Sequence, residues 1–66
     1  MYKIKKIGSI KFLFGDNKSM AKKIGISHIS LWRILNGKAN TTYKTAYCIV
    51  KLYDPEKEVL DYFKII

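Results

Sequence analysis

Side chains able to act as acids, bases, nucleophiles or metal ligands are few in this 66-residue chain. His28 is the only histidine, Cys48 is the only cysteine, and four of the five acids lie between residues 54 and 61. A catalytic nucleophile needs a neighbouring base, and a structural zinc site needs four Cys or His ligands. The sequence therefore predicts no enzyme, no metal site and no cofactor.

Basic side chains are abundant, and they are unevenly distributed. The formal net charge is +8. Residues 1–53 hold eleven Lys or Arg and one acid, which gives +10, whereas residues 54–66 hold four acids and two lysines, which gives −2. A positive surface of this kind indicates a polyanionic partner, most commonly nucleic acid. The alternative is that the lysines only keep the surface hydrated.

The length of the chain bounds its architecture. A chain this short buries only about 60% of the surface that it exposes when unfolded, and natural domains of this size add disulfides, metals or a partner subunit. With one cysteine, a partner subunit remains, and the lone thiol fits a reducing, cytoplasmic setting. The longest apolar runs fall far short of the roughly 20 residues of a membrane span. We expect a single domain over residues 1–66.

Apolar spacing predicts an all-α fold, a compact bundle of about five short helices. The expected helices span residues 5–14, 17–24, 28–36, 42–53 and 55–64. The first of them contains Gly8, and the alternation in its YKIKKI start also fits a short N-terminal strand. Start and stop signals flank the other helices: Asp16, Ser27, Thr41 or Thr42, and Asp54 as N-caps, Pro55 at a first helical position, and Gly37 at an end.

Each expected helix has an apolar face that would turn toward a common core. In chain order the inward positions are Ile7, Ile10, Leu13 and Phe14; Met20, Ala21 and Ile24; Leu31, Ile34 and Leu35; Tyr43, Ala46, Ile49, Val50 and Tyr53; and Val59, Leu60 and Phe63. This assignment leaves His28, Ile29, Trp32 and Arg33 for another surface.

Only residues 25–27 connect the second and third expected helices, so these helices must cross steeply. The crossing needs a small side chain, which Ala21 supplies, and a turn residue that tolerates positive φ, which Gly25 supplies. Apolar side chains such as Leu31 and Ile34 then close the wedge between the helices. Spacing and residue types therefore predict a helix-turn-helix over residues 17–36.

These positions resemble the Cro/C1-repressor type of helix-turn-helix, which small phage repressors use. The resemblance covers residues 9–53 and continues through Asn36-Gly37-Lys38 into Asn40, Thr42 and Tyr43. Two departures are Asn17, where the family usually has Gln, and the short, interrupted first helix. The resemblance implies a sequence-specific regulator of double-stranded DNA, most simply a repressor that binds a two-fold-symmetric operator.

The resemblance also implies roles for individual residues, because the second helix of this motif enters the major groove. The expected base contacts are His28, Ile29, Ser30, Trp32 and Arg33, and the expected phosphate contacts are Asn17, Lys18, Asn36, Lys38 and Asn40. Packing on a neighbouring helix is the alternative for Trp32, and peripheral packing is the alternative for Ile29. Lys22 and Lys23 fit either phosphate contact or plain solvation, and Lys3, Lys5 and Lys6 fit either a basic arm or a disordered tail.

A homodimer on DNA is the further expectation from the resemblance. The least basic segment, residues 55–64 with its DYFKII end, offers Tyr62, Phe63, Ile65 and Ile66 as a dimer surface. The alternative is that these residues cap the core of a monomer. A second class of function also remains open, a protein-interaction module on the same fold, such as an antitoxin or a phage inhibitor of a host protein.

Overall fold

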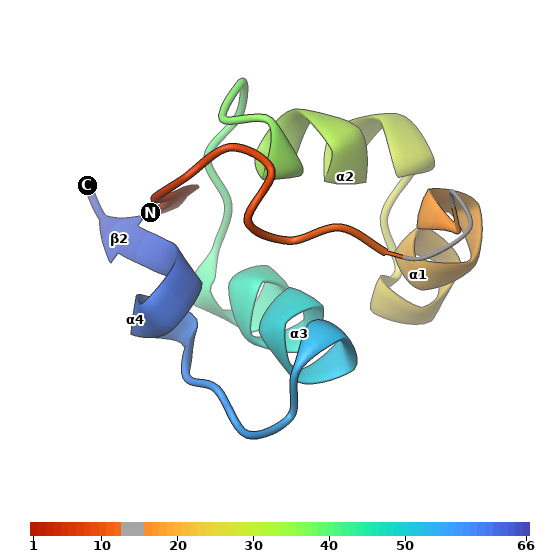
Figure 1. Ribbon diagram of the computed structural model, residues 1–66. Coiled ribbons are helices and arrows are strands. Elements are labelled where there is room, and N and C mark those ends of the chain that lie inside the picture. The colour runs from red at the N-terminus through yellow and green to blue at the C-terminus, as the bar shows by residue number, and fades with distance from the viewer. Residues whose placement is uncertain (13–15) are drawn as a thin grey trace.

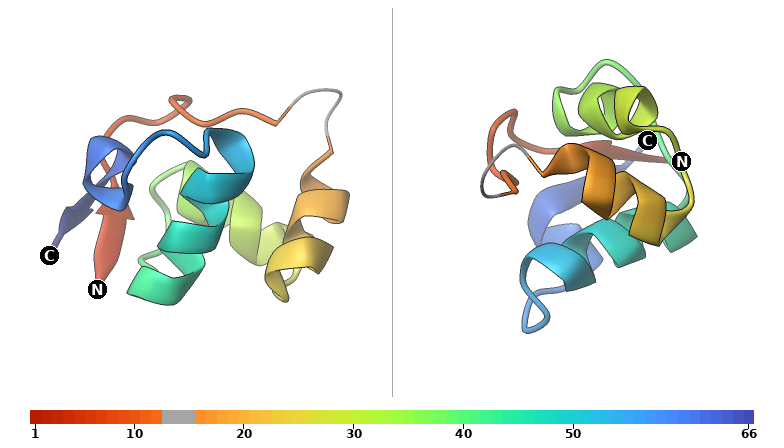
Figure 2. Two further views of the ribbon diagram at one scale, coloured as in Figure 1. Left: turned by 90° about the horizontal axis from the view of Figure 1, so that it is seen from below. Right: turned by 90° about the vertical axis from the view of Figure 1, so that its right-hand side faces the viewer.

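The computed structural model describes residues 1–12 and 16–66, which contain four helices and a two-stranded sheet (Figure 1). In chain order the elements are β1 (Tyr2–Ile4), α1 (Asn17–Ile24), α2 (His28–Leu35), α3 (Tyr43–Tyr53), α4 (Val59–Tyr62) and β2 (Phe63–Ile65). This part of the chain is mostly helical, but it is not the all-α, five-helix bundle that the sequence predicts. The sheet brings the N- and C-terminal segments side by side at one edge of the molecule (Figures 1 and 2).

The predicted helix over residues 5–14 is wrong in its described part. Residues 5–10 form turns and bends, residues 11 and 12 are irregular, and the amide of Ser9 donates to the carbonyl of Lys6 across 3.1 Å. Ile10 is buried while Ile7 is exposed, which places them on opposite sides of the segment and not on one helical face. The other two expected inward positions, residues 13 and 14, lie outside the described residues.

The short N-terminal strand, which the sequence left open, is present and pairs antiparallel with β2. Ile4 lies opposite Phe63, and both side chains are buried, so this face of the sheet belongs to the core. The other edge of β1 is also occupied, because Tyr2 and Thr41 exchange backbone hydrogen bonds of 2.7 and 2.8 Å. β1 is therefore held between β2 and the segment that follows α2.

The helix-turn-helix is formed by α1, residues 25–27 and α2, as the sequence predicts. Gly25 ends α1 with φ +91°, and its amide donates to the carbonyl of Ala21 across 2.8 Å. Ala21 is buried where the two helices meet. Ser27 begins α2 as a true N-cap, because its hydroxyl accepts the amide of Ser30 at 3.1 Å. Asp16 occupies the N-cap position of α1, but its predicted capping hydrogen bond is not formed.

Gly37 ends α2 in the left-handed region, with φ +72°. Its amide donates to the carbonyl of Ile34, and the next amide, of Lys38, donates to the carbonyl of Arg33 across 2.8 Å. A Cβ at this glycine would lie 3.4 Å from Cγ1 of Ile7. The predicted stop signal is therefore confirmed, and the N-terminal segment packs directly over it.

The C-terminal region differs most from its prediction. α3 begins after Thr42, whose hydroxyl donates to the hydroxyl of Thr45 and makes no backbone cap. The single helix expected over residues 55–64 is replaced by a turn, the four-residue α4 and β2. Asp54 caps no helix here, because its carboxylate accepts the amide of Glu56 within the turn. Glu58 occupies the N-cap position of α4 instead, and its amide donates to the carboxylate of Asp61 across 2.7 Å.

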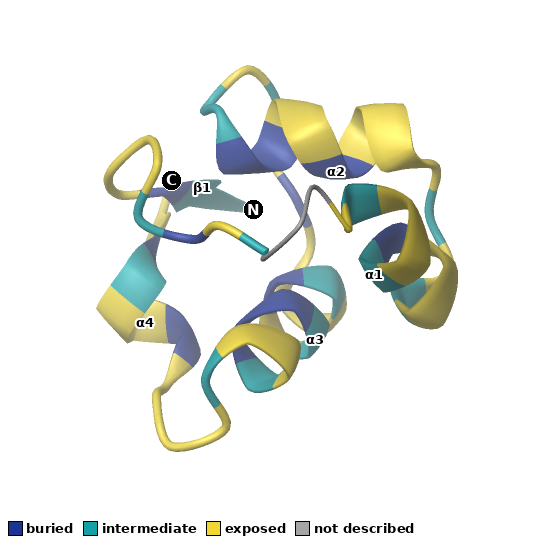
Figure 3. Ribbon diagram, turned by 45° about the vertical axis from the view of Figure 1, so that its right-hand side comes forward, coloured by how far each residue is buried: buried dark blue, intermediate teal, exposed yellow. Residues whose placement is uncertain are grey.

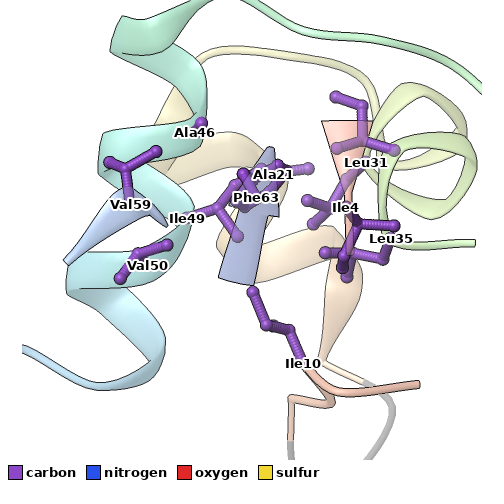
Figure 4. Packing of buried hydrophobic residues seen from close by; sticks show 11 residues of the cluster. Ile4, Ile10, Ala21, Leu31, Leu35, Ala46, Ile49, Val50, Val59 and Phe63 are labelled. Atoms are coloured by element: carbon purple, nitrogen blue, oxygen red, sulfur yellow. The ribbon is translucent and has the colours of Figure 1, made fainter. Parts of the chain in front are cut away.

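One hydrophobic core unites all six elements (Figure 4). Its centre is formed by Leu31 from α2, Ile49 from α3 and Phe63 from β2, which are fully buried. Leu60 was expected to point inward but is 53% exposed, because the short α4 turns only Val59 to the core. The remaining buried apolar residues are Ile4, Ile10, Ala21, Ile34, Leu35, Ala46 and Val50.

Candidate nucleic-acid interface

The outer surface of α2 carries a row of exposed side chains of mixed chemistry. Leu31, Ile34 and Leu35 are buried beneath the helix, so the side chains between them are turned to solvent (Figure 3). Ile29 is 56% exposed and Trp32 is 47% exposed. The exposed row is completed by His28, Ser30 and Arg33. The structure thus brings together on one helix all five residues that were expected to contact bases.

Ser30 is oriented by the cap of α2. Its hydroxyl accepts a hydrogen bond from the hydroxyl of Ser27 at 2.9 Å, while its amide donates back to the same residue. A hydroxyl that accepts in this way still has its own proton to donate. The hydroxyl of Ser30 is therefore oriented so that it can donate a hydrogen bond on the exposed side of the first turn of α2.

Trp32 lies at the border of the exposed row. It lines a hollow of about 260 Å³ together with Gly8, Ile10, Lys11, Phe12, Asn17, Leu35 and Asn36. Trp32 therefore faces the N-terminal segment and the start of α1, and nearly half of its surface remains open to solvent. This arrangement gives it both a packing contact and an exposed ring edge.

The residues expected to contact phosphate lie at the two ends of the helix-turn-helix. Asn17 and Lys18 form the first turn of α1, where Asp16 leaves the helix amides without a side-chain cap. Lys38 and Asn40 are exposed just after α2. Asn36 is less suited to this role, because its side-chain amide donates to the carbonyl of Trp32 at 2.8 Å.

The N-terminal lysines do not form a free arm. Lys3 lies within β1 opposite Lys64 of β2, and the backbone amide of Lys5 donates to the carbonyl of Tyr62 across 2.8 Å. Like charges directly opposite each other in a sheet repel. The register of the sheet therefore places these two basic residues opposite each other, where a bound anion would relieve the repulsion.

Most of the positive charge is unpaired within the described residues. The one ion pair among them joins Lys51 Nζ and a carboxylate oxygen of Glu58 at 3.9 Å. Lys22 and Lys23 are exposed in the last turn of α1 and lack an acidic partner in residues 1–12 and 16–66. The positive charge of these lysines is therefore available to attract an anionic partner.

The expected dimer residues separate into two groups. Phe63 is 0% exposed at the centre of the core, so its side chain cannot contact a partner, and this assignment is wrong. The ring of Tyr62 is half-buried and packs edge-to-face on the ring of Tyr53, with centroids 5.7 Å apart. Ile65 and Ile66 are exposed on β2 and just after it.

Sequence reasoning missed an aromatic stripe along α3. Tyr43 was expected in the core, but Tyr43 and Tyr47 are both exposed, with ring centroids 6.0 Å apart. The ring of Tyr2 continues the stripe 5.6 Å from Tyr43, and Nζ of Lys51 lies 5.5 Å from the Tyr47 centroid. The four-residue spacing of Tyr43 and Tyr47 on α3 indicates that they share one face of the helix. The contact of Tyr43 with Tyr2 of β1 could not be predicted, because it depends on the fold.

Comparisons with known proteins add no relatives: no family model, curated protein or solved structure matches this chain. Within residues 1–12 and 16–66, no helix has the length and apolar character needed to cross a bilayer. The same residues contain no group of three or more His, Cys, Asp or Glu side chains placed to hold a metal ion.

Proposed function

We propose that this protein is a sequence-specific double-stranded DNA-binding regulator, most simply a Cro-like repressor. The observation that carries the proposal is α2 itself, a helix crossed tightly against α1 whose outer surface is free and chemically varied. The second helix of a helix-turn-helix enters the major groove, which is about 12 Å wide and accepts one α-helix. Such a regulator would act in the cytoplasm of a bacterial host.

The exposed row on α2 supplies the chemistry to distinguish base pairs. Arg33 can donate two parallel hydrogen bonds to O6 and N7 of guanine, and Ile29 can contact a thymine methyl. His28 and Ser30 lie at the start of α2, the end that reaches base edges in this motif. Trp32 at the border of the row is placed to contact sugar or a thymine methyl with its open edge.

Phosphate contacts would fix the position of α2 and supply most of the affinity. Lys18 and the uncapped amides at the start of α1 can hold one phosphate, since a helix N-terminus favours an anion. Lys38 and Asn40 can hold the strand beyond the end of α2. Asn17 can assist at α1, and Asn36 contributes least because its amide already serves the backbone of α2.

We infer that the protein binds as a two-fold dimer through the open edge of β2. The amide of Ile66 donates to Met1 and the carbonyl of Tyr62 accepts from Lys5, so the backbone groups of residues 63 and 65 point to the open edge. Antiparallel pairing centred on Ile65 would place it against Ile65 of the partner subunit and bury both exposed side chains. Pairing centred on Lys64 would oppose two ammonium groups, which disfavours that register.

The experiment that tests the proposal is selection of bound duplexes from a random DNA pool at near-physiological salt. A two-fold-symmetric consensus with half-sites one helical turn apart, about 34–36 Å, is the expected result. Binding that depends on salt but enriches no sequence would contradict the proposal, because it would reduce the basic surface to a general polyanion contact.

The second candidate is a protein-interaction module, and the stripe formed by Tyr2, Tyr43 and Tyr47 is the observation that favours it. Exposed aromatic side chains are enriched at protein interfaces. The single variants Tyr43→Ser and Tyr47→Ser separate the two candidates. Under the leading proposal both variants still select the DNA consensus. Under the second candidate both variants no longer bind a partner protein that binds the wild type.

A further inference from the structure

A groove of about 600 Å³ opens beside the core and is lined by residues of the N-terminal segment, α1, the end of α3 and the end of α4. Ligand pockets in proteins commonly measure about 300–1,000 Å³. Its lining combines apolar and aromatic side chains with charged ones. The described lining residues are Lys11, Phe12, Asp16, Met20, Leu52, Tyr53, Asp54 and Tyr62. None of them is a residue assigned to DNA contact, but Asp16 directly precedes Asn17 and Lys18, so the groove adjoins the phosphate-contacting turn of α1 and lies away from α2.

Three aromatic rings form the wall of this groove. Tyr53 stands between the other two, with its centroid 6.1 Å from that of Phe12 at an interplanar angle of 78° and 5.7 Å from that of Tyr62 at 89°. Rings arranged nearly perpendicular to one another present faces in different directions. The face of an aromatic ring attracts a cation, and several ring faces around one space are the usual way to hold an organic ammonium group.

The charge of the groove is opposite to that of the protein. Two of the five acids, Asp16 and Asp54, line it, against one of the thirteen basic residues, Lys11. Neither carboxylate forms an ion pair with the described residues. One oxygen of Asp54 accepts the amide of Glu56 at 3.2 Å, which fixes the carboxylate and leaves its second oxygen for a ligand.

We propose that this groove binds an organic cation, a primary ammonium or guanidinium group carried on an apolar chain. The charged head would lie between the carboxylates and the ring of Tyr53, and the apolar chain would pack on Met20 and Leu52. This binding site goes beyond the proposed DNA function and does not depend on it. The positive charge of Lys11 repels the positively charged head of the ligand, which limits the affinity. The repulsion favours ligands whose apolar chain is long enough to place the head near Asp54.

The test uses n-hexylammonium as the cation and 1-hexanol as its neutral counterpart, with no DNA present. Met20 lines the groove, and the only other methionine, Met1, lies at the N-terminus, so their ¹³C-labelled methyl signals provide a site probe and an internal reference. Titration with hexylammonium should shift the Met20 signal and leave Met1 in place. Equal affinity for hexanol, or an unmoved Met20 signal, would overturn the proposal.

Matched variants then identify the charge that matters. Asp54→Asn keeps the acceptor for Glu56 and should weaken hexylammonium binding about two- to five-fold, the range for an exposed ion pair. Glu56→Gln removes one acid from the same turn outside the lining and should leave the affinity unchanged. Lys11→Gln should tighten binding, and Tyr53→Leu should weaken it. Equal effects of the Asp54 and Glu56 variants would overturn the proposal, because they would show only a general response to net charge.

The source of the cation is separated by a second titration with the blocked peptide acetyl-Leu-Lys-Leu-amide. Binding tighter than that of hexylammonium would support the site and assign it to a segment of a partner protein. Weaker binding of the peptide, with hexylammonium still bound, would support the site and assign it to a small amine. Failure of both probes would overturn this proposal and leave the DNA proposal untouched, because α2 takes no part in the assay.

Discussion

Replacement of Phe63 by alanine should remove a large part of the stability of the protein. The ring is fully buried and lies opposite Ile4 in the sheet, so its removal leaves a cavity at the centre of the core. A buried Phe→Ala substitution costs about 3–5 kcal/mol. At 0.05–0.15 kcal/mol per residue, the total stability of a chain of this length is about 3–10 kcal/mol, so the loss is a large part of the whole. Phe63→Leu keeps most of the volume and should cost about 1 kcal/mol.

Urea unfolding followed by far-ultraviolet circular dichroism measures this effect. With a slope of about 1 kcal/mol per molar urea, Phe63→Leu should lower the midpoint by about 1 M, and Phe63→Ala should lower it by about 3–5 M. Leu60→Ala is the matched control in the adjacent helix, and because Leu60 is exposed it should change the stability by less than about 0.5 kcal/mol. If Phe63→Ala kept the wild-type midpoint and impaired only dimer formation, the place of β2 in the core would be refuted.

Four further predictions concern the DNA surface, the turn and the dimer. Arg33→Ala should cost about 1–3 kcal/mol of binding and relax preference at one base pair, measured as Kd on the selected operator and on single-base variants; a loss equal on all sequences would instead assign Arg33 to phosphate. Lys38→Ala should reduce the slope of log K against log salt by about 0.9, whereas Lys57→Ala, in the turn before α4, should not; an unchanged slope would remove Lys38 from the interface. Gly25→Ala should lower stability in a thermal melt by about 1–2 kcal/mol through left-handed strain alone, since beyond the two neighbouring residues no atom lies within 4 Å of the added Cβ. Because asparagine tolerates this conformation, Gly25→Asn should cost less, and equal losses would contradict that cause. Ile65→Pro removes an amide from the open edge of β2 and should abolish dimers on operator DNA in sedimentation experiments; dimers that persist would place the interface elsewhere.

The helix-turn-helix could be predicted from the sequence because its signals are local. Ser27 and Gly37 mark the start and end of α2 through contacts within four residues, and Gly25 ends α1 in the same way. Ala21 was identified by the short connection alone. The exposed row on α2 followed, since three buried positions on an eight-residue helix determine which side faces solvent.

The sheet and the C-terminal region could not be predicted in the same way. β1 becomes a strand because β2 and Thr41 occupy its two edges, and neither partner lies near it in the sequence. The DPEKE segment has the residue types of a helix start, yet Asp54 uses its carboxylate to close a turn. Phe63 then turns inward on a strand, which moves Leu60 to the surface. The groove could not be predicted for the same reason, because its three aromatic rings come from separate segments of the chain that only the fold brings together.

The pairing of Tyr2 with Ile65 has a consequence for the order of events during synthesis. Contacts within α1, the turn and α2 span few residues, so this unit can form early, whereas β1 must wait until residue 65 has left the ribosome. At 5–20 residues per second, that delay is several seconds. Throughout it Ile4 lacks the ring of Phe63, and the nascent chain exposes an incomplete core. A slow codon run before residue 63 would therefore lengthen the period in which chaperones bind the incomplete core.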